Sequence, residues 1–302
     1  MAAQQYLLGV DGGGTTCRAR LTDRDGTVLG QGLAGPCNIR LGAGVAWAEI
    51  HRACAAAFAE ARVPQAAQAQ TVAVFGLAGA AQAAHLDAFL DQLHPFAALD
   101  VTGDAVIACL GAFGGADGAI LITGTGSAGF GLVNGRQVTA GGWGFEISDH
   151  GSGAWIGRRA LELAVLGWDG LTDAGVLGPA VLARFGGSPF GVVDWAGTAR
   201  PADYAALVPV VLEQAAAGDP VAVALLTEAA GHAARVLRRL RDQGAPRLAL
   251  VGGLAGVLAA HLPPQERGWL SDPQGDALSG ALILAKQSLA KQSLGHRQEE
   301  TR

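Results

Sequence analysis

Lysine is almost absent from this chain of 302 residues, which contains it only at Lys286 and Lys291. Each of these lysines follows an alanine, so no GxxxxGK[ST] motif exists anywhere in the sequence. That motif cradles the phosphates of nucleotides in P-loop proteins. Its absence excludes a P-loop nucleotide-binding protein.

The chain also lacks an excess of positive charge and long apolar runs. Its net charge is −5, which offers no extended basic surface to nucleic acid. The N-terminal stretch MAAQQYLLGVDGGG has neither the basic residues nor the long apolar core of a signal peptide. The most apolar later run, LALVGGLAGVLAA, is too short to span a bilayer. We therefore expect a cytoplasmic protein that binds neither nucleic acid nor a membrane.

Cysteine is scarce, and its four occurrences are scattered along the chain. No CxxC pair is present, so neither a zinc knuckle nor a disulfide framework is indicated. We expect all four to be buried as small hydrophobic residues. They are Cys17, Cys37, Cys54 and Cys109.

Glycine, in contrast, is abundant, with 46 residues, and two glycine-rich segments follow the same plan. Residues 6–32 contain a strand-like run, the turn DGGGTT and two further strand-like runs around the turn RDG. Residues 118–140 repeat this order with GAILI, TGTGS, AGFGLV, the turn NG and RQVTA. Tight turns between alternating runs are typical of β-hairpins. The sequence thus predicts the same unit of strand, glycine turn and hairpin twice.

The remaining segments alternate between helical and strand-like patterns in the first half of the chain and are mainly helical after residue 150. Apolar spacings of three and four predict helices at 45–62, 82–93, 154–167, 203–217, 220–244 and 276–287. Short apolar runs predict further strands at 71–76, 98–103 and 247–253. The polar end of the chain is expected to fray. Together these patterns predict an α/β protein.

Residues 124–129, GTGSAG, match the GxGxxG pattern of dinucleotide-binding folds. In those folds the glycine turn opens a helix. Here the turn is followed by FGLVNGRQV, which alternates and ends in a hairpin turn. The pattern therefore favours a strand-to-hairpin turn over a Rossmann turn.

Both glycine turns have backbone amides and hydroxyl groups that can donate to phosphate oxygens. Two such turns would suit a nucleoside triphosphate, although for either turn alone the glycines could merely permit a tight hairpin. The hydroxyl groups belong to Thr15, Thr16, Thr123, Thr125 and Ser127.

Two aspartates at predicted strand ends are candidates for phosphoryl-transfer chemistry. Asp11 precedes the first glycine turn and would support Mg²⁺ beside phosphates, or else cap the turn. Asp104 follows the strand-like run LDVTG and would act as a general base toward a substrate hydroxyl. The alternative for Asp104 is an N-cap of the helix that follows it.

Residues 141–153, GGWGFEISDHGSG, combine five glycines with Trp143, Glu146, Asp149 and His150. An aromatic ring next to several hydrogen-bonding groups suits a sugar. A loop packed beneath the following helix is the alternative, and His150 taken alone is expected to be structural.

Taken in order, DGGGTT, the GD pair ending at Asp104, TGTGS, GGW and SDHGSGAWIG resemble the BadF/BadG-type (BadF/BadG/BcrA/BcrD) ATPase family. Within this family the motifs are most similar to those of bacterial glucosamine and N-acetylglucosamine kinases. The resemblance extends from residue 6 to about residue 286 and includes PQGDALSGAL near the end.

The resemblance implies the two-lobed, duplicated ribonuclease H-like α/β fold of actin-like ATPases and sugar kinases, with a five-stranded sheet in each lobe and ATP and sugar between them. We expect residues 1–112 and 274–290 to form the N-terminal lobe. Residues 113–273 would form the C-terminal lobe, and residues 291–302 a polar tail.

The resemblance also implies site residues. Asp11 would support Mg²⁺, and Asp104 would be the catalytic base. The implied ATP contacts are Asp11, Gly12, Gly13, Gly14, Thr15, Thr16, Thr125, Gly126 and Ser127, with Gly252 and Gly253 on the adenosine side. The implied sugar contacts are Asn38, Asp104, Thr125, Trp143 and Asp149.

One residue departs from the N-acetylglucosamine branch of the family, in which a serine stands at the position of Ala78. We therefore expect an ATP-dependent kinase for the 6-hydroxyl of glucosamine, with N-acetylglucosamine as the alternative substrate. Its partners would be ATP, Mg²⁺ and a small amino sugar, and a homodimer is compatible with this assignment. The alternative of another class is an ATPase that activates a radical dehydratase or reductase. Such an activator needs cysteines spaced to hold an iron–sulfur cluster.

Overall fold

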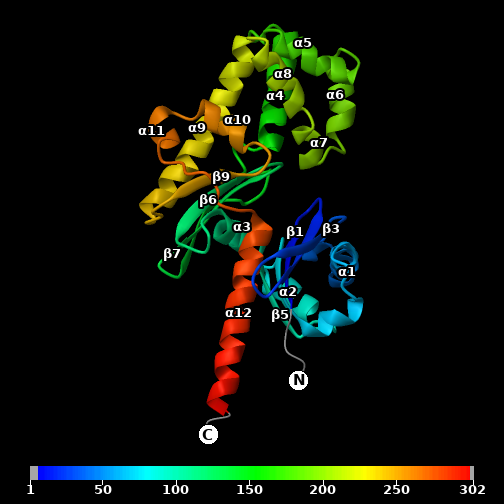
Figure 1. Ribbon diagram of the computed structural model, residues 1–302. Coiled ribbons are helices and arrows are strands. Elements are labelled where there is room, and N and C mark those ends of the chain that lie inside the picture. Colours follow the sequence, from blue (N-terminus) through cyan, green and yellow to red (C-terminus); the bar gives the residue numbers. More distant parts are fainter. Residues whose placement is uncertain (1–5, 300–302) are drawn as a thin grey trace. The chain divides into compact units, whose positions relative to one another are not determined.

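The computed structural model describes residues 6–299, with side chains up to Lys291. The chain forms two compact units (Figure 1). Unit 1 contains the chain up to Asp117 and again from Asp272, and unit 2 contains Gly118–Ser271. The chain therefore leaves unit 1 once and returns to it for its last helix.

Unit 1 is built on a five-stranded sheet with the order β3-β2-β1-β4-β5. The first three strands form an antiparallel hairpin arrangement, whereas β4 and β5 run parallel to β1. This pairing confirms the strand, glycine turn and hairpin predicted at the N-terminus. The strands are β1 (Tyr6–Gly12), β2 (Cys17–Asp23), β3 (Val28–Ala34), β4 (Thr71–Leu77) and β5 (Ala98–Gly103).

Helices cover both faces of this sheet. Alternate side chains of a strand point to opposite faces, and accordingly Leu8 and Val10 pack with α1, while Leu7 packs with α3 and α12. Glycines let α3 and α12 approach closely, since a Cβ built on Gly111 would lie 1.9 Å from the carbonyl oxygen of Asp276. The helices are α1 (Ala43–Glu60), α2 (Ala83–Leu90), α3 (Asp104–Ala112) and α12 (Ala277–Glu299), with short 3-10 turns at Ile39–Leu41 and Gln65–Gln70.

Unit 2 repeats the strand, glycine turn and hairpin, as predicted. Its sheet has the order β8-β7-β6-β9, in which β9 runs parallel to β6. The strands are β6 (Gly118–Thr123), β7 (Ser127–Val133), β8 (Arg136–Gly141) and β9 (Leu248–Val251).

The prediction of a five-stranded sheet in unit 2 is wrong, because the sheet has four strands in the described part of the chain. A single parallel bridge joins Leu248 to Leu270 beyond β9. Pro273 follows shortly afterwards, and proline has no N–H to extend a ladder of hydrogen bonds. The segment therefore makes one bridge instead of a strand.

The helices of unit 2 share one core with its sheet, and α9 contacts β6, β7 and β8. The single helix predicted at 203–217 is two helices, because Pro209 lies in the first turn of α8, where a missing N–H is tolerated. The helices are α4 (Gly153–Trp168), α5 (Leu177–Leu182), α6 (Pro189–Ala196), α7 (Pro201–Ala205), α8 (Val208–Ala216), α9 (Pro220–Asp242), α10 (Ala255–His261) and α11 (Pro264–Arg267), with a 3-10 turn at Ala183–Phe185.

Two further expectations concern the chain end and the cysteines. The last helix continues to Glu299, beyond the position where the sequence predicts a frayed tail, and residues 300–302 lie outside the described part. All four cysteines are fully buried in unit 1, as predicted. Among the described residues, no helix is both long and apolar enough to cross a bilayer.

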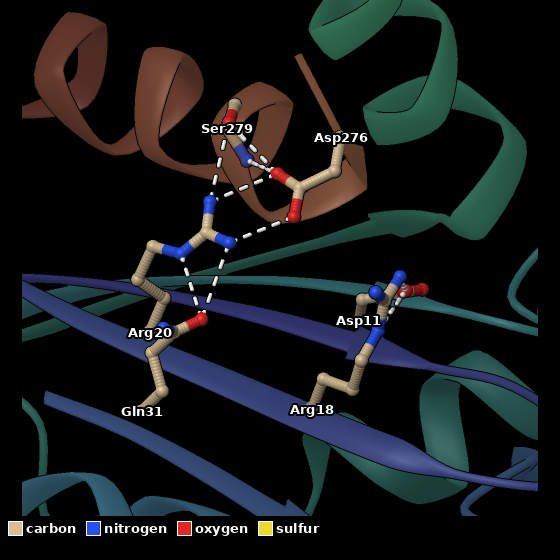
Figure 2. A network of polar contacts seen from close by, with 6 residues as sticks. All are labelled: Asp11, Arg18, Arg20, Gln31, Asp276 and Ser279. Atoms are coloured by element: carbon tan, nitrogen blue, oxygen red, sulfur yellow. Dashed lines mark hydrogen bonds and ion pairs between the residues drawn. The ribbon is translucent and has the colours of Figure 1, made fainter.

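A charged clamp joins the first turn of α12 to the sheet of unit 1 (Figure 2). Arg20 on β2 donates from Nη1 to Asp276 Oδ1 at 2.9 Å and from Nη2 to Oδ2 at 2.7 Å. Ser279 adds its N–H and hydroxyl to the same carboxylate. Burial opposes ionisation of Asp276, but these donors outweigh it and lower its pKa to about 2. The clamp therefore fixes α12 against the sheet while Asp276 is ionised.

We predict that the clamp makes the attachment of α12 sensitive to acid. A carboxyl whose pKa is lower in the folded state stabilises that state above its unfolded pKa and loses this effect as the pH falls through the folded pKa. The free energy of opening α12, from amide hydrogen exchange at 277–285, should therefore fall between about pH 4 and about pH 2. Asp276→Asn should weaken the attachment by roughly 1 kcal/mol at pH 7, since the pair is partly exposed to solvent, and should remove this acid dependence. Asp272→Asn, at an exposed neighbouring carboxylate, is the control, and equal curves for both variants would contradict the prediction.

Candidate functional site

Strand register brings three predicted site segments to one edge of the unit 1 sheet. Gly12 at the end of β1 pairs with Leu77 of β4, which in turn pairs with Gly103 of β5. Because the strands are parallel, the residues that follow leave the sheet at the same edge, and ligands of α/β proteins bind at such edges. Asp104 is the first residue after β5, and Asp11 is the last residue but one of β1. The two predicted carboxylates therefore lie at the same edge of the sheet.

The first glycine turn, residues 13–16, projects from this edge. Gly13 N–H donates to Thr16 O at 2.9 Å, and Gly14 to Thr16 are exposed. A Cβ built on Gly12 would lie 2.5 Å from both Cys37 Sγ and Leu77 Cδ2, so this glycine is required by packing. Gly13 has no neighbour closer than 3.6 Å, and Gly14 has none within 4 Å. The open space needed for a bulky anion is therefore at Gly13 and Gly14.

Asp11 is paired with Arg18, which the sequence analysis did not single out. The two residues face each other across β1 and β2, and Arg18 Nε donates to Asp11 Oδ2 at 3.2 Å (Figure 2). A second guanidinium nitrogen contacts the same oxygen. The signal available in the sequence was the hairpin register, which places Arg18 directly opposite Asp11. The first glycine turn therefore has a cation as well as an anion at its base.

The donors at this edge fit a magnesium ion held largely by phosphates. Asp11 offers carboxylate oxygens, which Mg²⁺ prefers. Within the part of the chain that the structure describes, no group of three or more His, Cys, Asp or Glu side chains is arranged to hold a metal. Proteins commonly bind Mg²⁺ through one or two carboxylates plus substrate phosphates instead of a complete cage. A single carboxylate at this position suits that mode.

Asp104 begins α3, with Gly103 as the N-cap. Its Oδ1 accepts from the N–H of Ala105 at 2.9 Å. Burial raises the pKa of Asp104 above its usual range, the Ala105 hydrogen bond opposes this, and the negative charge of Asp11 adds to it. A carboxylate that binds a proton more readily than usual is suited to act as a base.

Asn38 and Ala78 lie beside the first glycine turn. Cys37 N–H donates to Gly13 O at 3.1 Å, and Ile39 N–H donates to Ala78 O at 3.1 Å, so Asn38 is held between these contacts. Asn38 Oδ1 accepts from Arg40 N–H at 3.0 Å. This bond uses the side-chain oxygen, and the side-chain nitrogen takes no part in it.

In unit 2, the second glycine turn, residues 123–127, lies against the chain that follows β9. Thr123 is buried and donates its hydroxyl to Val251 O at 3.3 Å, so it supports the turn and does not offer that group to a ligand. A Cβ on Gly252 would lie 2.2 Å from Thr123 O, whereas Gly253 has no neighbour within 4 Å. Thr125 is exposed at the tip. The structure thus brings the second turn together with Gly252 and Gly253, the glycines that the resemblance assigns to the adenosine side.

The glycine loop, residues 141–153, connects β8 to α4 and is bonded to the same turn. Asp149 Oδ1 accepts from Gly144 N–H at 3.3 Å, and Ser127 Oγ donates to His150 O at 3.3 Å. Trp143 is 76% exposed, so its ring is not packed beneath the following helix, contrary to the alternative given above. The His150 ring stacks on His232 with centroids 5.0 Å apart. The end of the loop next to α4, at Asp149 and His150, is therefore held in place, and the ring of Trp143 is open to a ligand.

A separate hollow of unit 2 lies away from these residues. It has a volume of about 490 Å³ and an apolar lining that includes Leu161, Val165, Val192 and Tyr204. None of the predicted site residues lines it. Its chemistry gives no reason to place phosphate or sugar there.

Comparison with known proteins identifies the family of the chain. Residues 8–285 match the model of the BadF/BadG/BcrA/BcrD ATPase family. The chain belongs to this family. The resemblance seen in the motifs is thereby confirmed over nearly the whole chain, and the family description identifies an ATPase.

Individual relatives support the same placement. The chain is 38% identical over 280 residues to the glucosamine kinase GspK of Vibrio cholerae, covering 93% of this chain and 95% of that protein. A candidate N-acetylglucosamine kinase from Chromobacterium violaceum is 40% identical, with a TM-score of 0.87 over 93% of this chain and 99% of that one. A ROK family glucokinase from Streptomyces griseus, at 20% identity and a TM-score of 0.58 over 93% of this chain and 99% of that one, shares the fold. The predicted fold class is confirmed.

We predict that the glycines of the first turn separate into two kinds. Gly13→Val should abolish binding of ATP without unfolding unit 1, because its side chain would fill the space proposed for phosphate. Gly12→Ala should instead lower the thermal unfolding temperature, because its Cβ would overlap Cys37 and Leu77. Isothermal titration with ATP and thermal unfolding of both variants check this. Normal ATP affinity in Gly13→Val would show that the first turn is not a phosphate site.

Proposed function

We propose that the protein is an ATP-dependent amino-sugar kinase that transfers the terminal phosphoryl group of ATP to the 6-hydroxyl of glucosamine. The observation that carries the proposal is the position of Asp11 and Asp104 at one sheet edge, beside a glycine turn with open space. Family membership and the 38% identity to a glucosamine kinase support it. Both glycine turns would contact phosphates, with Gly253 on the adenosine side.

In the proposed reaction, Asp104 accepts the proton of the sugar 6-hydroxyl as its oxygen attacks the γ-phosphorus, and ADP leaves on the opposite side. Asn38 would donate to the sugar, with Trp143, Thr125 and Asp149 as further contacts. The backbone N–H groups of the glycine turns and the Arg18 guanidinium would offset charge on the phosphates. When bound, Mg²⁺ supported by Asp11 would supply further neutralisation of that charge.

The identity of the amino sugar depends on Ala78. Its N–H donates to Gly12 O at 2.8 Å and its carbonyl accepts from Ile39, so both backbone groups are already bonded. The methyl side chain adds no donor for the carbonyl of an acetamide. A free ammonium group needs negative charge nearby when it is removed from water, and Glu146 in the glycine loop would supply it. These features favour glucosamine, although the Chromobacterium relative favours N-acetylglucosamine.

The activator function is disfavoured by the positions of the cysteines. A cluster is held by thiolates, and all four cysteines are fully buried. A hydrogen bond with Cys37 and burial raise the pKa of Cys17, and burial raises the pKa of Cys54 to about 12. Thiols in this environment remain protonated and make poor iron ligands. A brown colour of the purified protein would indicate an iron–sulfur cluster and would favour the activator function instead.

The direct test of the proposed function is release of ADP from ATP and Mg²⁺ across a panel of glucosamine, N-acetylglucosamine and glucose. We expect the highest kcat/KM with glucosamine. A tenfold preference for N-acetylglucosamine, about 1.4 kcal/mol in transition-state stabilisation, would contradict the assigned sugar and preserve the kinase. No stimulation by any of these sugars would contradict the kinase itself.

We predict that Ala78→Ser changes this preference. The added hydroxyl provides a donor for an acetamide carbonyl, so kcat/KM for N-acetylglucosamine should rise about 3- to 10-fold relative to glucosamine, as expected for one hydrogen bond. Glucose is the control substrate, since it carries neither group. An unchanged ratio would place the 2-substituent away from Ala78.

We also predict that Asp104→Asn lowers kcat by roughly 10² or more while the affinities for ATP and sugar change little, because a general base acts in the transition state. In the wild-type enzyme the base must be ionised, so kcat/KM should fall on the acid side. Because the pKa of Asp104 is raised, this fall should begin at a higher pH than for an ordinary aspartate. Near-normal turnover of the variant would show that Asp104 is not the base and has only a structural place in the first turn of α3.

A further inference from the structure

The second glycine turn and the end of the glycine loop are connected by several hydrogen bonds within unit 2. Gly153 N–H donates to Gly124 O at 2.8 Å, and Ala154 N–H donates to Thr125 O at 3.0 Å. The Ser127 hydroxyl bonds His150 O from the other side of the turn. The turn proposed to contact phosphate and the loop proposed to contact sugar are therefore attached to each other.

Asp149 is the side chain that connects both segments. Its carboxylate accepts from Gly144 N–H of the loop at 3.3 Å. It also lies against the second glycine turn at Gly126, where a built Cβ would be 2.7 Å from Oδ2. One carboxylate thus binds a backbone N–H of the loop and lies against the backbone of the turn.

The backbone at Asp149 is unusual for this residue type. Its φ is +55°, in the left-handed region that glycine adopts with least strain. Aspartate tolerates this region when its side chain bonds locally, but the conformation still costs on the order of 1 kcal/mol. A glycine would avoid this cost, so the aspartate contributes its hydrogen bond to Gly144 and its position against Gly126.

The part of the loop around Trp143 is attached to α7 by Phe145, whose ring centroid lies 5.1 Å from that of Tyr204. Trp143 is 76% exposed and Ile147 is 78% exposed, so neither side chain anchors the loop by packing. Glu146 is exposed as well. A sugar that contacts Trp143 would therefore act on a segment whose connection to the phosphate turn runs mainly through Gly144 and Asp149.

We propose that Asp149 is a positioning residue that couples the two ligands, so that sugar bound at the glycine loop shapes the second glycine turn and tightens nucleotide binding. This inference rests on the proposed function and extends it. It gives Asp149 a role that is separate from any direct contact with the sugar. By thermodynamic linkage, the nucleotide must tighten sugar binding by the same factor.

The test is to measure the Kd of ADP, with Mg²⁺ present, at zero and at saturating glucosamine. We expect glucosamine to lower this Kd about tenfold in the wild-type protein. Asp149→Gly keeps the left-handed backbone but removes the carboxylate, and should reduce the effect to less than about twofold. Asp149→Asn keeps one acceptor oxygen and should give an intermediate effect. In Ile147→Ala, which shortens an exposed side chain of the same loop, the effect should remain about tenfold.

The measurement separates coupling from simple sugar contact. If Asp149 only contacted sugar, its variants would weaken sugar binding, but the tenfold effect would return at saturating glucosamine. That result, or an absence of coupling in the wild-type protein, would overturn the inference. A protein that phosphorylates glucosamine without coupling would overturn the inference alone, whereas one that neither binds nor phosphorylates any sugar would overturn the proposed function too. Thermal unfolding of both Asp149 variants confirms that they are folded.

Discussion

Parallel pairing of β1 with β4 and β5 is the constraint on which the site in unit 1 depends. It aligns Gly12, Leu77 and Gly103, so that the chain leaves three adjacent strands at the same edge. Asp11, Ala78 and Asp104 lie at these strand ends although they are far apart in the sequence. Parallel pairing of β6 with β9 has the same effect in unit 2, where Thr123 and Gly252 are brought into contact. The two halves of the proposed site thus arise from one arrangement used twice.

Charge explains why this edge suits phosphoryl transfer. Burial raises the pKa of Asp104, and the negative charge of Asp11 at the same edge adds to this. Arg18 balances Asp11 on the side of β2. Asp104 has no such ion pair among the contacts described for it, and its carboxylate instead accepts from a backbone N–H. In the proposed reaction, Asp11 would therefore support charge and Asp104 would act as the base.

Much of this arrangement was predictable from the sequence. The turns DGGGTT and TGTGS lie between alternating runs, and both predicted hairpins are present. Local patterns could not show that Gly12 and Gly252 are required by packing, because their close neighbours, Cys37 and Thr123, come from other segments of the chain. Nor could they show that Thr123 uses its own hydroxyl internally. Arg18 was missed because its importance follows from strand register. The single helix predicted at 203–217 is two helices, because Pro209 marks the start of a second helix and this signal was not used.

The central claim is that the phosphoryl group passes from ATP to a sugar hydroxyl and not to water. Phosphorus NMR of the full-length protein with ATP, Mg²⁺ and glucosamine tests this directly, since it distinguishes a sugar 6-phosphate from inorganic phosphate. We predict one equivalent of sugar 6-phosphate for each ADP formed, and little ADP when the sugar is omitted. Formation of inorganic phosphate at the same rate with and without the sugar would contradict the account.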